Sequence, residues 1–159
     1  MKYGKVKILF WFWSVITVFI CICIFVLSSQ NGNNSGMLSQ GLTRRLFLGL
    51  LSDKSLYIAE KILRKIAHYL IYFSLGISMY LSVCNFNSGY LSRRIKYGNL
   101  ILPVVLICFL YSVGDEIHQM FIPGRYGAFY DCMIDTFGAF CGILFVLLLK
   151  KILKLFKNK

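Results

Sequence analysis

The chain has 159 residues, of which 58% are apolar or aromatic and only 15% are charged, and its formal net charge is +12. A soluble domain averages roughly 45–50% apolar and about 25% charged residues. The composition therefore excludes an ordinary soluble enzyme and a disordered tail, and it predicts one membrane domain over residues 1–159. Because the basic residues lie between apolar runs, as in membrane proteins, we expect no nucleic-acid partner.

Four apolar runs are long enough to cross a bilayer. A helix rises about 1.5 Å per residue, so about 20 residues cross a hydrocarbon core of roughly 30 Å. We therefore expect an all-α, polytopic membrane helical bundle with spans over residues 8–27, 65–84, 99–120 and 131–149. The first run is longer than a signal-peptide core and no small-residue cleavage site follows it, so we interpret it as a retained helix.

Residues 37–51 have a different pattern. Four leucines recur at every fourth position and two arginines stand off their stripe: Leu38, Leu42, Leu46, Leu50, Arg44 and Arg45. This periodicity predicts a short amphipathic helix at the extracytoplasmic membrane surface. Further along, Pro123 and Gly124 predict a type II turn, because Pro presets φ and Gly accepts a positive φ.

The basic residues predict an orientation. Four spans place both termini on one side of the membrane. Lys and Arg number three in the N-terminal tail, three in the 85–98 connection and five in the C-terminal tail, against one in the 121–130 loop. The positive-inside rule counts short loops most, so we expect the termini and the 85–98 connection to be cytoplasmic. Six basic residues in the long 29–65 segment oppose this assignment.

Three of the expected spans carry a polar stripe on one helix face. With the expected topology all three stripes lie near the extracytoplasmic ends of their helices, so we expect them to converge. Carboxylates near lipid are costly and must face protein or water. With Arg125 of the intervening loop, the stripes give ten predicted ligand-binding residues. They are Lys65, His68 and Tyr72 in the second span, Ser112, Asp115, Glu116 and Gln119 in the third, Arg125, and Asp131 and Asp135 in the fourth. Gly138 and Gly142 share the last face and predict a close helix contact.

Two interpretations of this cluster stay open. A structural ion-pair network would set Lys65 and Arg125 against four carboxylates, which leaves an excess of negative charge. A functional site would resolve the excess through a protonated carboxyl, protonation of His68, a bound cation or a water-filled vestibule. We favour the functional site, because ionisable groups within a membrane are functional by default.

Two kinds of chemistry would suit these residues. Asp115, Glu116 and His68 are candidate acid–base groups. A divalent cation such as Mg²⁺ or Mn²⁺ is a candidate cofactor, since carboxylates are its preferred ligands. Its candidate ligands are Asp115, Glu116, Asp131 and Asp135.

Several stretches match a known family pattern. They read FVLSSQ at residues 25–30, KIAH at 65–68 with Tyr72 and Leu75 after it, DEIHQMFIPGR at 115–125, and Asp131 and Gly138 beyond. On these residues the chain resembles the VanZ-like family, whose pattern is K-x-x-H-x-x-x-Y, D-E-x-x-Q-x-F-x-P-x-R and D-x-x-x-N-x-x-G. The resemblance covers about residues 25–145. Asp135 stands where the family usually has Asn, so a titratable group replaces a fixed amide.

The resemblance implies a multi-pass protein of the bacterial cell membrane. The family's prototype is associated with resistance to the glycopeptide antibiotic teicoplanin, so a role in the Gram-positive cell envelope is implied, without a reaction. The favoured hypothesis is an outward-facing pocket that binds the headgroup of a membrane lipid or lipid-linked cell-wall precursor, in which Arg125 and Lys65 suit a phosphate or carboxylate.

The alternative hypothesis is a membrane-embedded, metal-dependent enzyme acting on a lipid-linked substrate. The sequence carries no nucleophile elbow, P-loop or HExxH motif that would identify a known enzyme class. Whether the protein is an enzyme therefore stays open. A proton-coupled transporter is disfavoured, since the cytoplasmic halves of the helices are purely apolar and offer no continuous path. No feature of the sequence indicates an oligomeric state.

Overall fold

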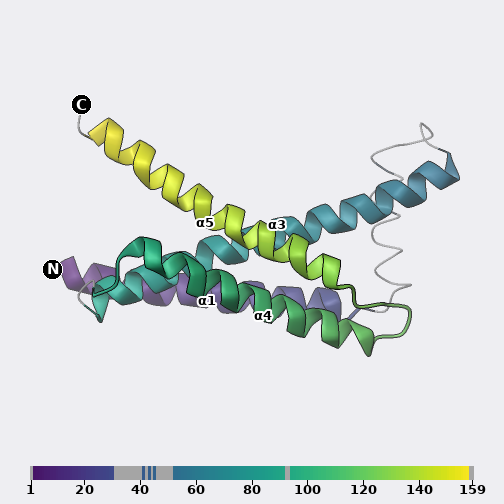
Figure 1. Ribbon diagram of the computed structural model, residues 1–159, viewed down its shortest axis with the longest axis horizontal. Coiled ribbons are helices and arrows are strands. Elements are labelled where there is room, and N and C mark those ends of the chain that lie inside the picture. The colour runs from purple at the N-terminus through teal and green to yellow at the C-terminus, as the bar shows by residue number, and fades with distance from the viewer. Residues whose placement is uncertain are drawn as a thin grey trace.

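The computed structural model describes residues 2–30, 41, 43, 45, 52–91 and 94–157. These residues form four long helices, and a short 3-10 helix precedes the third. The elements are α1 (Lys2–Ser28), α3 (Asp53–Gly89), η1 (Tyr97–Leu100), α4 (Ile101–Met120) and α5 (Phe129–Lys157). Each long helix is apolar and long enough to cross a membrane. The all-α bundle with four candidate spans is thereby confirmed (Figure 1).

The helices extend beyond the expected spans. α3 has 37 residues and begins at Asp53, before the expected membrane span that starts at Lys65, with the Ser52 side chain accepting a hydrogen bond from the backbone N–H of Ser55. At about 1.5 Å per residue it is roughly 55 Å long, more than a hydrocarbon core requires. Hydropathy marks where a chain enters lipid, whereas a helix continues into water until its sequence breaks it. The expected amphipathic helix over residues 37–51 lies outside the described residues, apart from 41, 43 and 45.

α3 runs through the middle of the bundle and packs against both α1 and α5. Small residues allow the α3–α5 contact. A Cβ added at Gly138 would lie 2.6 Å from the backbone oxygen of Tyr69, and one added at Gly142 would overlap the backbone oxygen of Phe73. The close contact predicted for these two glycines is confirmed, and it brings the polar faces of α3 and α5 together.

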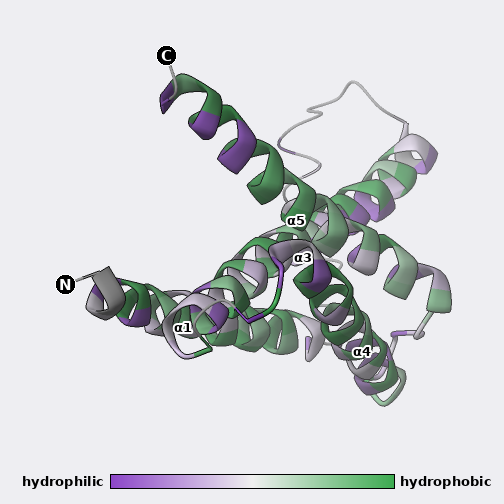
Figure 2. Ribbon diagram, turned by 60° about the vertical axis from the view of Figure 1, so that its left-hand side comes forward, coloured by the Kyte–Doolittle hydropathy of each residue, from purple (hydrophilic) through white to green (hydrophobic). Residues whose placement is uncertain are grey.

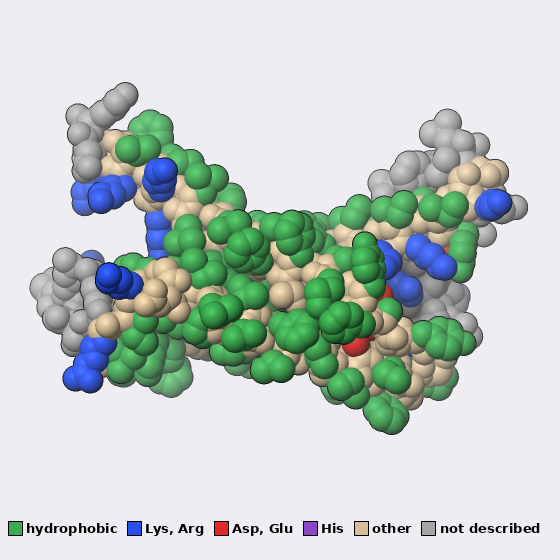
Figure 3. All heavy atoms as spheres, viewed as in Figure 1, with side chains coloured by type: hydrophobic (Ala, Val, Ile, Leu, Met, Phe, Trp, Pro, Cys, Tyr) green, Lys and Arg blue, Asp and Glu red, His purple; other side chains and the backbone are tan. Residues whose placement is uncertain are grey.

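The outer surface of the bundle is apolar, as a bilayer requires. Apolar side chains such as Trp11 and Val15 of α1 and Leu102 of α4 are more than half exposed. Green apolar side chains cover most of the middle of the molecule, while lysines and arginines gather at its two ends (Figure 3). Apolar residues likewise predominate along the helices in the ribbon coloured by hydropathy (Figure 2). This distribution fits a multi-pass membrane protein.

The two ends of the bundle differ in composition. The described parts of both termini lie at one end, with the C-terminal end of α3 and with η1 (Figure 1). The opposite end collects the last turn of α1, the N-terminal part of α3, the last turn of α4 and the first turn of α5. The three polar stripes therefore meet at this second end.

Candidate functional site

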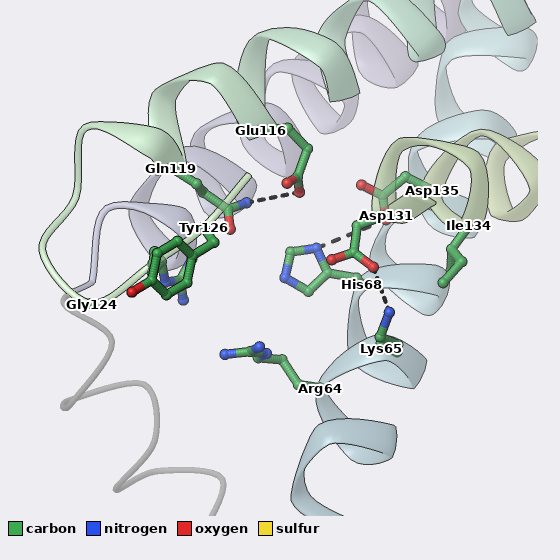
Figure 4. Close-up of a pocket in the computed structure, with 11 residues that line it drawn as sticks. Arg64, Lys65, His68, Glu116, Gln119, Gly124, Tyr126, Asp131, Ile134 and Asp135 are labelled. Carbon is green, nitrogen blue, oxygen red and sulfur yellow. Dashed lines mark hydrogen bonds and ion pairs between the residues drawn. The ribbon is translucent and has the colours of Figure 1, made fainter. Parts of the chain in front are cut away.

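A polar cavity of about 170 Å³ lies where α3, α4 and α5 meet the loop between α4 and α5. Side chains from the three helices point toward one another there (Figure 4). Its lining consists of Arg64, Lys65 and His68 from α3, Glu116 and Gln119 from α4, Gly124, Arg125 and Tyr126 from the loop, and Asp131, Ile134 and Asp135 from α5. Seven of the ten predicted ligand-binding residues line this cavity. The other three, Tyr72, Ser112 and Asp115, are fully or almost fully buried in the helices around it.

The loop is shaped by the predicted turn. Gly124 adopts φ 77°, and the backbone N–H of Arg125 donates to the carbonyl of Ile122 at 3.1 Å. Gly127 then brings the loop back against α4, since a Cβ there would lie 2.6 Å from the backbone oxygen of Glu116. The loop therefore forms one wall of the cavity.

Lys65 and Asp131 form an ion pair at the exposed side of the cavity. The Lys65 Nζ lies 2.7 Å from the Asp131 Oδ1, and the two side chains are 44% and 33% exposed. The same ammonium lies 4.9 Å from the centroid of the Tyr130 ring. Exposed pairs of this kind stabilise a protein by only about 0–1 kcal/mol. The pair can open to a ligand at small cost.

Asp135 is the most deeply placed of the lining carboxylates and is fully buried. Its Oδ2 accepts a hydrogen bond from the Ser112 hydroxyl at 2.8 Å. Its Oδ1 lies 3.8 Å from the Nδ1 of His68, which is too long for a hydrogen bond. Asp135 therefore has one satisfied oxygen and one oxygen facing an incompletely paired histidine.

Asp115 and Glu116 are held by neutral donors. The Asp115 Oδ2 accepts from the Ser28 hydroxyl at 2.8 Å and from the Gln119 amide at 2.9 Å. The two Glu116 oxygens accept from the same amide at 3.2 Å and from the backbone N–H of Ala128 at 2.8 Å. Both carboxylates are only 6% exposed, so neither faces lipid.

Arg125 closes the end of α1 instead of pairing with those carboxylates. Its Nη1 donates to the backbone oxygen of Ser28 at 3.1 Å and its Nη2 to that of Leu27 at 3.4 Å. These are among the last carbonyls of the helix, which have no partner within it. Burial lowers the pKa of Arg125, the nearby charge of Arg64 lowers it further, and Asp115 and Glu116 raise it. The guanidinium remains a cation, as arginine does in proteins.

The network considered from the sequence, in which Lys65 and Arg125 oppose all four carboxylates, is therefore wrong in its pairing. Only Asp131 receives a cation directly within the described residues. The Ser28 hydroxyl donates to Asp115 and the Ala128 N–H donates to Glu116, where the expected network had Lys65 or Arg125 as the partner. Neither was identified from the sequence, because a serine hydroxyl or a backbone N–H carries no charge pattern. Arg64 was also missed as a lining residue; its position beside Lys65 was the available signal.

Four buried side-chain polar atoms of the described chain have no hydrogen-bond partner, and all four belong to this region. They are the Nδ1 of His68, the hydroxyl of Tyr72, the Nε of Arg125 and the Oδ1 of Asp135. Tyr72 is fully buried and lies one turn beyond His68 on α3. Buried polar atoms are nearly always paired, so such a concentration is unusual for a purely structural network.

The four candidate metal ligands do not gather around one point. Across the described part of the chain, no three His, Cys, Asp or Glu side chains are arranged to hold a metal ion. Asp115 and Glu116 point to donors on α1, α4 and the loop, whereas Asp131 pairs with Lys65. The geometry supports a cavity for a polar group more than a metal centre.

Comparison with known proteins identifies a family. A family model described as VanZ/LLP1 matches residues 12–150, a range that contains every residue lining the cavity. Comparison with curated proteins gave no match, and comparison with solved structures gave none.

Proposed function

We propose a function on the premise that this chain belongs to the VanZ/LLP1 family, whose model matches residues 12–150. The chain is a VanZ-like multi-pass membrane protein, of a family associated with glycopeptide resistance. Its cavity faces the extracytoplasmic side of the bacterial cell membrane and binds the headgroup of a membrane lipid or lipid-linked cell-wall precursor. Through this binding it raises tolerance to teicoplanin-type antibiotics.

The concentration of unpartnered polar atoms carries the proposal. A network that served only to fix helix register would gain most by satisfying each member, because a buried polar atom without a partner costs about 1–3 kcal/mol. Here four such atoms surround or adjoin one cavity. A bound polar headgroup would supply the missing donors and acceptors.

The chemistry of the lining fits a headgroup. Arg64, Lys65 and Arg125 can bind a phosphate or carboxylate, and guanidinium groups do so with two parallel hydrogen bonds. Glu116 and Asp135 can accept hydrogen bonds from hydroxyl or amino groups. A lining with both signs of charge suits a ligand that carries both an anionic group and hydrogen-bond donors.

The orientation rests on the basic residues at the other end of the bundle. The N-terminal tail, the 85–98 connection and the C-terminal tail carry 11 of the 18 Lys and Arg residues. The positive-inside rule places that end in the cytoplasm and the cavity outside. An extracytoplasmic cavity meets lipid-anchored ligands, and a lipidated glycopeptide is itself partly membrane-resident through its acyl chain.

Tolerance measurements in a susceptible Gram-positive host test this function. Expression of the chain should raise tolerance to teicoplanin, with a smaller effect on vancomycin, which lacks the acyl chain. Arg125→Gln and Glu116→Gln should abolish the gain, since each removes a charge from the cavity. Asp135→Asn should retain it, because the family usually has Asn at this position.

Matched controls separate the site from a general loss of charge. Arg94 is exposed in the chain beyond α3, and Glu60 lies on α3 outside the cavity lining. Arg94→Gln and Glu60→Gln should behave as the unmodified chain. Full tolerance in Arg125→Gln and Glu116→Gln at normal abundance would refute the proposed site, and an equal effect on vancomycin would indicate a general change of the envelope.

A membrane-embedded enzyme is a second candidate, favoured by one observation. His68 lines the cavity with an unpartnered Nδ1 that lies 3.8 Å from the buried carboxylate of Asp135. A histidine oriented by a carboxylate can act as a general base toward a bound lipid-linked substrate. In that case His68→Gln and Asp135→Asn would both stop product release from such a substrate, and tolerance would fall in Asp135→Asn as well.

A further inference from the structure

A second cavity, also of about 170 Å³, lies between α1 and α3 at the same end of the bundle. Its walls are largely apolar and include Ile24 and Leu27 of α1 and Ala67 and Ile71 of α3. Leu27 is 50% exposed, so this groove opens to the outer, lipid-facing surface of the bundle. An apolar chain could therefore enter it sideways from the bilayer.

The groove and the polar cavity are adjacent. Arg64, His68 and Arg125 line both of them. A single molecule could therefore place a polar part in one and an apolar part in the other, with its junction beside these three side chains. An amphiphile, with one polar and one apolar part, matches this pair of adjoining cavities.

The junction is positively charged. Among the described residues, neither Arg64 nor Arg125 forms an ion pair, whereas Lys65 is occupied by Asp131. Arg125 uses two of its nitrogens on backbone carbonyls and has a third, Nε, that is buried without a partner. The two guanidinium groups are near enough for the charge of Arg64 to lower the pKa of Arg125. Two like charges at such a place favour an anion between them, and phosphate fits guanidinium best.

The polar cavity continues beyond the junction toward acceptors. The unpartnered Oδ1 of Asp135 and the carboxylate of Glu116 lie on its α5 and α4 sides. Carboxylates accept hydrogen bonds from hydroxyls and repel a second anion. The part of the ligand beyond the phosphate should therefore be neutral and carry hydroxyl groups.

From these observations we infer that the two cavities together bind one phosphodiester lipid with a hydroxylated headgroup. The phosphate lies between Arg64 and Arg125, the headgroup hydroxyls face Asp135 and Glu116, and one acyl chain follows the groove between α1 and α3. This inference rests on the proposed function and names the class of ligand for its site.

Native mass spectrometry of the purified full chain in detergent tests it, with phosphatidylglycerol as the probe. We expect a saturable complex with one lipid per chain. Phosphatidylcholine, which has the phosphate but no headgroup hydroxyl, should bind at least about tenfold more weakly, because it cannot donate hydrogen bonds to the two carboxylates. A polyprenyl phosphate, which is a monoester without a hydroxylated headgroup, should also bind more weakly. Equal or tighter binding of either lipid would overturn the assignment.

Two substitutions test the two halves of the binding site. Arg64→Gln removes an exposed cation that holds no partner in the described structure, and Ala67→Trp fills the groove. Each should weaken phosphatidylglycerol binding by about tenfold or more. The matched controls are Arg94→Gln, beyond the other end of α3, and Ser74→Trp, which is exposed on α3 outside the groove. Binding that is the same in each variant and its control would refute the inference.

The outcome also distinguishes this inference from the proposed function. If phosphatidylglycerol shows no saturable binding while teicoplanin tolerance still depends on Arg125, the lipid assignment fails and the proposed function stands. If binding follows the pattern above while tolerance is unchanged by Arg125→Gln, the lipid site stands and the resistance function fails. The exposed position of Arg64 keeps the test valid even where Arg125→Gln does not fold.

Discussion

The two ends of the bundle differ in how their buried polar side chains are hydrogen-bonded. At the end that holds the termini, Asn87 is almost fully buried and its amide is used on both sides: it donates to the backbone oxygen of Ile95 at 2.7 Å and accepts from the N–H of the same residue at 3.2 Å. Tyr80, also buried, donates to the backbone oxygen of Tyr97 at 3.2 Å. These buried polar groups are paired with the chain itself.

The cavity end has the opposite character. Its buried side chains include the carboxylates of Asp115, Glu116 and Asp135, and four buried polar atoms there lack a partner. At the end that holds the termini, Asn87 and Tyr80 join α3 to the segment that precedes α4. Their hydrogen-bonding atoms are already used within the protein. Pairing, more than polarity, therefore separates a structural group from a candidate site in this bundle.

The largest effect that tests this comparison is an all-or-none difference in accessibility. Tyr126 is 91% exposed at the cavity end, and Lys96 is exposed at the other. In a background without the six native cysteines, Tyr126→Cys should react with a membrane-impermeant maleimide in intact cells and Lys96→Cys should not. The positive-inside rule gives this direction.

The control for this labelling is permeabilised cells, in which both positions should react. Labelling of Lys96→Cys alone in intact cells would place the cavity in the cytoplasm. The extracytoplasmic assignment, and with it contact with external antibiotic, would then be wrong.

The convergence of the polar stripes could be predicted from the sequence because it depends on two regular periods. Hydropathy placed four spans, and spacing of three and four residues placed Asp115 and Glu116 on one face of the third. Alternating direction of the helices then brought that face to the same end as Lys65 and Asp131, as the structure shows.

The partners of these residues could not be predicted in the same way. The hydroxyl of Ser28 reaches Asp115 across 87 positions of the chain, and Ala128 offers only a backbone N–H to Glu116. Neither contact follows from periodicity, because the first depends on how α1 packs against α4 and the second on how the loop between α4 and α5 folds back. α3 extends beyond its expected span for a related reason, since a helix end outside lipid is set by local capping, here at Ser52, and not by hydropathy.

The next effect in size concerns the paired end. Asn87→Leu should lower the free energy of unfolding by about 2 kcal/mol, because it leaves the backbone N–H and oxygen of Ile95 without their partner. Phosphatidylglycerol binding and teicoplanin tolerance per folded molecule should not change. Denaturant unfolding in detergent measures the free energy of unfolding, native mass spectrometry measures lipid binding, and growth in the antibiotic measures tolerance.

Asn99→Leu is the matched control, since Asn99 is exposed in η1 and its side chain has no hydrogen bond in the described structure. It should leave stability nearly unchanged. A loss of lipid binding in Asn87→Leu at equal folded amounts would show that the paired end also takes part in the site, and the two ends would then not differ in role.

The smallest expected effect discriminates best, because replacing a buried tyrosine by phenylalanine should change the free energy of unfolding in opposite directions at two positions of α3. Tyr72 and Tyr80 lie two turns apart on α3 and are both fully buried, but only Tyr80 has a partner for its hydroxyl among the described residues. Tyr80→Phe should destabilise the protein by about 1 kcal/mol, since it removes a hydrogen bond and leaves the carbonyl of Tyr97 unpaired. Tyr72→Phe should stabilise it by up to about 1 kcal/mol, since it removes a buried hydroxyl that has no partner.

Each variant serves as the other's control in the same unfolding experiment. Destabilisation of Tyr72→Phe comparable to that of Tyr80→Phe would mean that the Tyr72 hydroxyl is hydrogen-bonded in the folded protein, and the distinction between the two ends would then rest on the remaining three atoms.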